Sequence, residues 1–189
     1  MAKSKNNVVT HGLSGLIGDL LVFRQRANKT IVADRPRAFS KPPTAIQLEI
    51  RQRFKKAVQY AKKALLDPIL KAAYQAMTKL GQTAFNTAFA DYQRAPEFDA
   101  EVSLETYSGA AGEEITVSVL DDFRVTSVKV EIRKLDGSLL EEGNAVQSDN
   151  GLDWVYTTTM VNTELAGSTI IFTASDLPGN RTVLEKTMM

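Results

Sequence analysis

The chain has 189 residues, 43% of them hydrophobic and 24% charged, a composition typical of a globular protein with a buried core. It contains one histidine and no cysteine, which excludes disulfide bonds and thiol catalysis and argues against a zinc site. No apolar run approaches the roughly 18 residues of a membrane-spanning helix. The basic residues 1–7 are not followed by the apolar segment of a signal peptide. We therefore expect synthesis in the cytoplasm without secretory export, and a place in a virion or an extracellular assembly stays open.

Charge is divided unequally along the chain, although the net charge is only +1. Residues 1–96 contain 17 Lys and Arg against 5 Asp and Glu, a difference of +12, whereas residues 97–189 contain 6 against 17, a difference of −11. So large an asymmetry indicates an electrostatic role. Two interpretations stay open: contacts between oppositely charged parts of different molecules, or a basic half that folds against its own acidic half.

Residues 1–43 are predicted to form an extended basic arm. The apolar residues of 19–26 indicate a strand, 27–29 can turn because Asn tolerates left-handed backbone angles, and 30–33 indicate a second strand, which together make a β-hairpin. A lone hairpin is marginally stable in water, so this one must pack on another element or another molecule. Residues 35–43 contain three prolines and are expected to be an extended linker.

Residues 44–96 are predicted to contain two or three helices. Thr44 and Gln47 fit a capping box at the start of the first helix. Its apolar side chains recur at helical spacing and are expected to be buried: Ile46, Ile50, Phe54, Val58, Ala61 and Leu65. The other faces of this helix are basic.

Asp67 and Pro68 mark the start of a second helix, with an acidic N-cap and proline at the first helical position. This helix is expected to bury five side chains: Ile69, Leu70, Ala73, Tyr74 and Met77. Gly81 suits its end. Phe85, Phe89 and Tyr92 indicate a third, short helix that stops before Pro96.

From residue 97 the spacing of apolar residues changes from the roughly 3.6-residue period of a helix to the two-residue period of a strand. Apolar residues alternate from Phe98 to Leu104 and again in later segments. Asp136-Gly137 and Asn150-Gly151 supply turn signals. The pattern predicts about seven short strands in residues 97–189, as in a β-sandwich.

The segment Thr173-Ala174-Ser175-Asp176-Leu177-Pro178-Gly179-Asn180 resembles the closing hairpin of bacterial immunoglobulin-like modules, which often read A-x-D-x-x-G-N. The resemblance covers about residues 97–189 and implies an immunoglobulin-like sandwich, a module found in spacers, adhesins and appendages. Phe23-Arg24-Gln25-Arg26 and Lys29-Thr30-Ile31-Val32 resemble short uncharacterised proteins of Bacteroidetes-type genomes, and this likeness implies no activity. The expected fold class is α+β: a hairpin arm (1–43), a small helical bundle (44–96) and the sandwich (97–189).

The sequence contains few residues in the patterns that catalytic sites require. His11 lies in a glycine-rich stretch, which argues against a rigidly held catalytic histidine. The nearby glycines match no phosphate-binding motif. Asp121 and Asp122, with Asp149 and Asp153, are candidate calcium ligands on sandwich loops, although solvated turn residues are the favoured interpretation. We predict no enzyme activity, no cofactor and no small-molecule substrate.

A structural, self-assembling subunit is the function that these patterns favour, as part of a filament, appendage or virion. Opposite charges suit head-to-tail contacts between copies, and a strand of the arm could add to the sheet edge of a neighbour. The arm residues expected at the interface are Leu20, Val22, Phe23, Arg24, Arg26, Arg35 and Arg37. Their expected acidic receptors are Glu113, Glu114, Asp121, Asp122, Glu141 and Glu142.

Two alternatives stay open. Leu20, Val22 and Phe23 could pack on helices of their own chain. The arginines and lysines of residues 24–41 could bind the phosphates of a nucleic acid, but no recognition helix or nucleic-acid-binding motif accompanies them.

Overall fold

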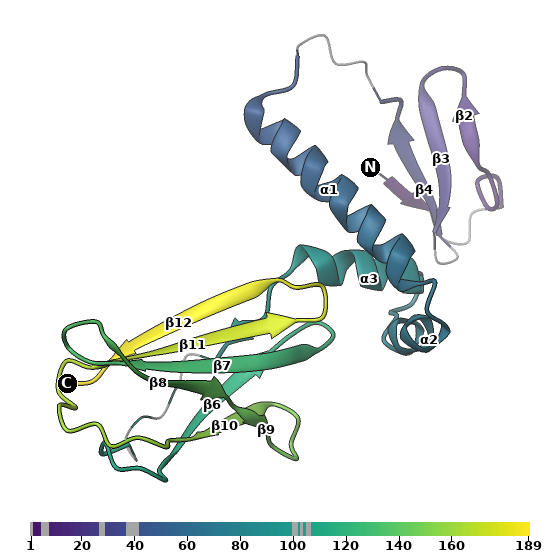
Figure 1. Cartoon of the computed structure of the whole chain (residues 1–189). Coiled ribbons are helices and arrows are strands. Elements are labelled where there is room, and N and C mark those ends of the chain that lie inside the picture. Colours follow the sequence, from purple (N-terminus) through teal and green to yellow (C-terminus); the bar gives the residue numbers. More distant parts are fainter. Residues whose placement is uncertain are drawn as a thin grey trace.

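The computed structural model describes residues 2–4, 8–26, 29–36, 42–99, 102, 104 and 107–189. Within these ranges the chain forms three helices and three antiparallel sheets (Figure 1), which confirms the mixed α+β class. No helix in the described ranges is both long and apolar enough to cross a membrane.

The N-terminal strands form one four-stranded antiparallel sheet, the arm sheet, in the order β1-β4-β3-β2. Its strands are β1 (Ala2–Ser4), β2 (Gly15–Ile17), β3 (Leu21–Arg26) and β4 (Lys29–Asp34). The predicted hairpin is confirmed as β3 and β4, in which Phe23 lies opposite Val32. Phe23 is buried but belongs to neither of the two larger core clusters of the chain. Phe23 is thus buried apart from the cores of the helices and of the C-terminal sheets.

Three helices follow, each with a capped N-terminus: α1 (Ala45–Ala64), α2 (Pro68–Ala76) and α3 (Ala84–Gln93). The predicted capping box is confirmed, because the Gln47 backbone N–H donates to Thr44 Oγ1 at 3.3 Å and the Thr44 N–H donates to Gln47 Oε1 at 3.1 Å. Asp67 caps α2 by accepting from the Ile69 N–H at 2.8 Å.

The helices share a core of small and aromatic side chains. Ala61 and Ala88 are fully buried, and these small residues allow α1 and α3 to approach closely. Tyr74 on α2 is fully buried and stacks on Phe123 from the β-sheet half of the chain, with ring centroids 4.1 Å apart. The helical core therefore includes a side chain from beyond residue 97.

The burial predicted for the first two helices is wrong at several positions. Ile46 and Ile50 are 69% and 61% exposed, Phe54 is also more than half exposed, and Ile69 is 82% exposed. Met77 is likewise exposed. For Ile46 and Ile50 the cause is length: α1 has 20 residues, or about 30 Å, whereas α2 and α3 have 9 and 10, and the buried residues of α1 all lie in its C-terminal half.

The C-terminal half contains two four-stranded antiparallel sheets. One has the order β5-β6-β10-β9, formed by Glu97–Phe98, Glu114–Leu120, Asp153–Thr157 and Val146–Gln147. The other has the order β12-β11-β7-β8, formed by Arg181–Thr187, Thr169–Asp176, Val125–Arg133 and Leu139–Asn144.

Side chains from both C-terminal sheets share a single core. Burial alternates along each central strand, as in Thr169–Asp176, because successive side chains point to opposite faces. Val117 of β6, Val130 of β7, Trp154 of β10 and Phe172 of β11 all belong to this core. The apolar alternation of the sequence predicted the inward positions of β6 and β7, as at Val117 and Val130.

The strand expected from Phe98 to Leu104 is described only in part: β5 covers Glu97–Phe98, and the Asp99 N–H still donates to the Ser118 carbonyl at 3.0 Å. Val102 and Leu104 pack against the core of the two sheets. Residues 100, 101 and 103 lie outside the described residues.

The helices dock on one end of the β-sheets. In Figure 1, α3 lies between α1 and the hairpin of β11 and β12. Phe123, after β6, and Leu177, after β11, pack against the helical core. Two loops of the β-sheet half thus form the junction with the helices.

Candidate functional site

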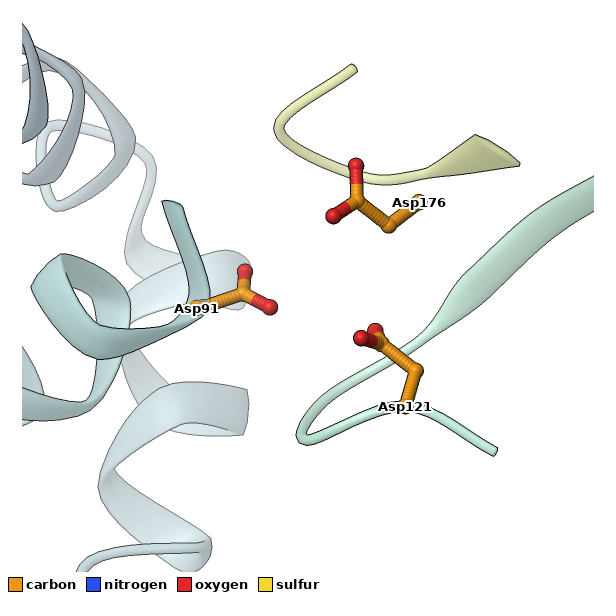
Figure 2. Close-up of side chains that lie close together, drawn as sticks. All are labelled: Asp91, Asp121 and Asp176. Atoms are coloured by element: carbon orange, nitrogen blue, oxygen red, sulfur yellow. The ribbon is translucent and has the colours of Figure 1, made fainter. Parts of the chain in front are cut away.

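Three aspartates meet at this junction, one from the helices and two from the β-sheets. Asp91 lies in the last turn of α3, Asp121 follows β6, and Asp176 ends β11. Figure 2 shows their carboxyl groups pointing toward one another. One oxygen of each lies within 4.8 Å of the corresponding oxygens of the other two. We call this group the aspartate triad.

Each aspartate is held in place by donors from its own neighbourhood. The Tyr74 hydroxyl donates to Asp91 Oδ2 at 2.6 Å, and Tyr60 and Tyr74 hydroxyls are 2.8 Å apart. Asp121 Oδ2 accepts from the Arg124 backbone N–H at 2.8 Å. Asp176 Oδ1 accepts the Asn180 backbone N–H at 2.6 Å. The carboxyl groups are therefore positioned by both halves of the chain.

Two oxygens of the triad have no donor. Asp91 Oδ1 and Asp121 Oδ1 are buried and make no hydrogen bond within the described structure. Asp91 as a whole is only 1% exposed. A buried polar atom without a partner destabilises the folded state by about 1–3 kcal/mol. The two unpartnered oxygens therefore destabilise this junction unless a further group lies between the carboxyl groups.

The triad has an unusual electrostatic environment. Burial is the main cause that raises the pKa of Asp91 to about 7, and the negative charges of Asp121, Asp176 and Asp122 raise it further. The hydrogen bond from Tyr74 lowers this pKa in part. Burial also raises the pKa of Asp176. None of the five ion pairs in the described part of the chain includes a member of the triad. The negative charge at this junction is thus not neutralised by a basic side chain.

Asn180 connects the triad to the end of α3. Its side-chain N–H groups donate to Asp176 Oδ2 at 2.7 Å and to the Arg94 carbonyl at 2.9 Å, with longer bonds to the carbonyls of Asp91 and Tyr92. The last carbonyls of a helix lack intrahelical donors. Asn180 therefore caps α3 from a different part of the chain.

Two clefts border the triad. Asp121 lines a cleft of about 280 Å³, and Asp91 lines a second one of about 140 Å³. Arg94 and Asp122 line both clefts and form an ion pair with each other at 2.5 Å.

Sequence reasoning found only part of the triad. Asp121 was a candidate calcium ligand, but its predicted companion Asp153 instead bonds Ser118 and Asn150. Asp176 stood out only as part of the A-x-D-x-x-G-N segment. Asp91, between helix residues, carried no signal beyond being one of few acidic residues in a basic region.

The apolar residues predicted at a subunit interface differ in exposure. Leu20 is 74% exposed, Val22 is half-buried and Phe23 is buried within the arm sheet. Phe23 is therefore already covered within its own chain. Beside Leu20, the edge strand β2 exposes Leu16 and Ile17.

The arginines predicted at the interface lie mainly on the arm surface. Arg24 and Arg26 are exposed on β3. Arg35 forms an exposed ion pair with Asp19 at 2.9 Å within the arm. Arg37 lies outside the described residues.

Several of the predicted acidic receptors are already engaged within the chain. Glu141 is buried, and its Oε2 accepts from the Tyr156 hydroxyl and from Thr159 and Met160. The side chain of Glu113 accepts three successive backbone N–H groups and the Ser108 hydroxyl. These two carboxylates stabilise turns of the β-sheet half and are poorly suited to receive a neighbour.

The other acidic candidates are more accessible. Glu142 binds Lys129 at 2.7 Å, and Asp122 binds Arg94. Glu114 is exposed at the start of β6. Asp121 belongs to the triad.

Comparisons with known proteins identify no family for this chain. No protein-family model matches it, and no curated protein matches it significantly. Among solved structures, the crystal structure of an engineered protein is similar with a TM-score of 0.32 and 16% sequence identity. This likeness covers 59% of the chain described here and 30% of the engineered protein, and it is too weak to carry a conclusion about fold or function.

Proposed function

We propose that the protein is a structural subunit that associates with copies of itself through its N-terminal half. The observation that carries this proposal is the apolar face of α1, on which Ile46 and Ile50 are 69% and 61% exposed. They continue the same helix stripe that is buried at Ala57 and Ala61. An apolar helix face that is buried at one end and exposed to solvent at the other is typical of a surface that a partner covers.

The arm sheet offers a second contact. Its strand β2 is an edge strand, since it pairs only with β3 in the described sheet. An exposed edge presents unpaired backbone groups that can pair with a strand from another molecule. Leu16, Ile17 and Leu20 add exposed apolar side chains beside this edge.

Charge supports a contact between unlike halves of two copies. The N-terminal half carries a difference of +12 and the C-terminal half −11, and Arg24 and Arg26 are exposed on the arm sheet. Head-to-tail contact of this kind is heterologous, and it either closes a ring or extends into a filament. The two facing sheets of residues 97–189, with the turn at Asp176–Asn180, support the assignment of this half to the immunoglobulin-like modules that serve as spacers and appendages.

Paired glutamate substitutions test the proposal. Ile46→Glu with Ile50→Glu is expected to convert assembled protein to monomer, because it places two charges on the apolar face. The matched control is Leu66→Glu with Leu80→Glu, which replaces two exposed apolar residues elsewhere on the helical part. Light scattering of all three proteins measures the effect, and circular dichroism checks that each retains its helices. Equal masses for the wild type and both variants would contradict the proposal.

Nucleic-acid binding is a second candidate, because the basic side chains of α1 are exposed. These residues are Arg51, Arg53, Lys55, Lys56, Lys62 and Lys63. Binding through them would weaken steeply with salt, since phosphate contacts release counterions. A mobility-shift titration at several salt concentrations distinguishes this candidate from self-association, which requires no nucleic acid.

A further inference from the structure

We propose that Asp91, Asp121 and Asp176 bind a divalent cation, with Ca²⁺ preferred, which fastens the helices to the β-sheets. The inference is independent of self-association, because the triad lies within one chain. It requires that the three carboxyl groups can contact one ion, that the site lacks another source of positive charge, and that the ligands are held in position.

The spacing of the triad suits a single ion. The three ligand oxygens lie within 4.8 Å of one another. Oxygens on opposite sides of a Ca²⁺ ion are about 4.8 Å apart, because each Ca–O distance is about 2.4 Å. One ion can therefore contact all three carboxyl groups with small side-chain movements. Mg²⁺ requires shorter distances of about 2.0–2.1 Å and a stricter octahedron, so it fits less well.

A buried oxygen without a partner is a second observation, besides the spacing of the carboxyl groups, that points to the ion. Asp91 is 1% exposed, and its Oδ1 makes no hydrogen bond within the described structure while its carboxyl group faces the other two aspartates (Figure 2). Asp121 Oδ1 is also buried and without a donor. Buried charges are ordinarily paired or coordinate a metal, and none of the ion pairs among the described residues includes any of these three side chains.

The hydrogen bonds that the triad does make hold its carboxyl groups in fixed orientations. Metal ligands in proteins are oriented in the same way, by hydrogen bonds from residues that do not contact the metal. Tyr74 fixes one oxygen of Asp91 and leaves Oδ1 free. Backbone N–H groups of Phe123 and Arg124 fix one oxygen of Asp121 and leave Oδ1 free. Asp176 is held through its turn and Asn180. Each carboxyl group thus has a defined direction before an ion arrives.

The ligand chemistry selects a hard cation. All three ligands are carboxylate oxygens, with no histidine or cysteine among them, and oxygen-only sites suit Ca²⁺, Mg²⁺ or Mn²⁺. Ca²⁺ takes 6–8 oxygens in proteins, so waters must complete its shell. Asp91 and Asp121 each line a cleft that borders the triad.

Asp91 can also be buried as a neutral acid, because burial and the neighbouring carboxylates raise its pKa. The alternative is that Asp91 is simply a buried neutral acid that binds no ion.

Calorimetric titration of the full chain with CaCl₂ after chelator treatment tests the inference directly. We expect one Ca²⁺ per chain with a dissociation constant below about 1 mM, the weak end of protein calcium sites, and a rise of several degrees in the unfolding temperature. Asp121→Asn should weaken binding at least tenfold. Asp149→Asn, which alters an exposed turn carboxylate outside the triad, should leave binding unchanged.

Asp91→Asn separates the two possibilities. The amide can still accept the Tyr74 hydrogen bond, so we expect a folded variant whose unfolding temperature no longer responds to CaCl₂. If CaCl₂, MgCl₂ and MnCl₂ all leave the wild type unchanged in both heat of binding and unfolding temperature at pH 8, Asp91 is a buried neutral acid only and the inference is overturned. Asp121→Asn that binds Ca²⁺ as tightly as the wild type, or Asp149→Asn that loses binding, also overturns this placement of the ion.

Discussion

The side chain of Asn180 donates to the backbone carbonyl of Arg94 at 2.9 Å, and this bond joins residues 86 positions apart. The same amide binds Asp176, two residues before the Pro178-Gly179 turn. A turn between two β-strands therefore supplies the cap of helix α3. This contact makes the helices and the β-sheets interdependent at their junction.

Asn180→Ala is expected to destabilise the protein by about 1–3 kcal/mol, because it leaves helix-end carbonyls and one oxygen of Asp176 without their donor. Urea unfolding followed by circular dichroism measures this loss. Asn144→Ala is the matched control, since Asn144 is exposed at the end of β8. Equal stability of the two variants would contradict the capping role of Asn180.

Tyr74→Phe removes the hydroxyl that lies between Tyr60 and Asp91. We expect a loss of about 1–3 kcal/mol at neutral pH, because a second oxygen of the buried Asp91 loses its donor. Tyr92→Phe is the control: Tyr92 is only half-buried and contacts Tyr60 through its ring. The free energies of unfolding of both variants, measured in urea, should differ by at least about 1 kcal/mol.

Stability without divalent cations should depend on pH through Asp91. Its pKa is raised from 3.8 to about 7 in the folded chain, so the folded state binds the proton more tightly than the unfolded state does. This contribution is fully present below about pH 4 and is lost as the pH rises toward 7, by at most about 1.4 kcal/mol per pH unit. In Asp91→Asn the free energy of unfolding in chelator should vary less between pH 4 and 7 than in the wild type. An unchanged pH dependence would show that Asp91 does not titrate in this range.

Two adjacent glutamates should respond differently to substitution. Glu141→Ala is expected to cost more than about 2 kcal/mol, since it leaves the buried Tyr156 hydroxyl and two donors of Thr159 without their acceptor. Glu142→Ala removes one exposed ion pair and should cost less than about 1 kcal/mol. Thermal unfolding of both variants measures the difference. A larger loss for Glu142→Ala would indicate that this side chain has a role outside the folded monomer.

The sequence predicted the local structure well where the signal is local. Thr44 with Gln47 and Asp67 with Pro68 located two helix starts to the residue, because capping depends on neighbours in the chain. Alternation likewise identified the inward residues of β6 and β7.

Contacts between distant segments could not be predicted in this way. The exposure of Ile46 and Ile50 depends on the length of α3, and the meeting of Asp91 with Asp121 and Asp176 depends on how the helices dock on the sheets. No spacing in the sequence encodes either relationship, since both arise from tertiary packing. The proposed assembly residues Arg24, Arg26 and Glu114 remain a prediction.

Light scattering of the purified full chain at low and high salt tests self-association most directly. We expect particles well above the monomer mass of 20.8 kDa, larger at low salt because exposed charges are less screened there, and reduced to monomers by deletion of residues 1–34. A monomer of about 21 kDa at every concentration and salt, unchanged by that deletion, would contradict the proposed function.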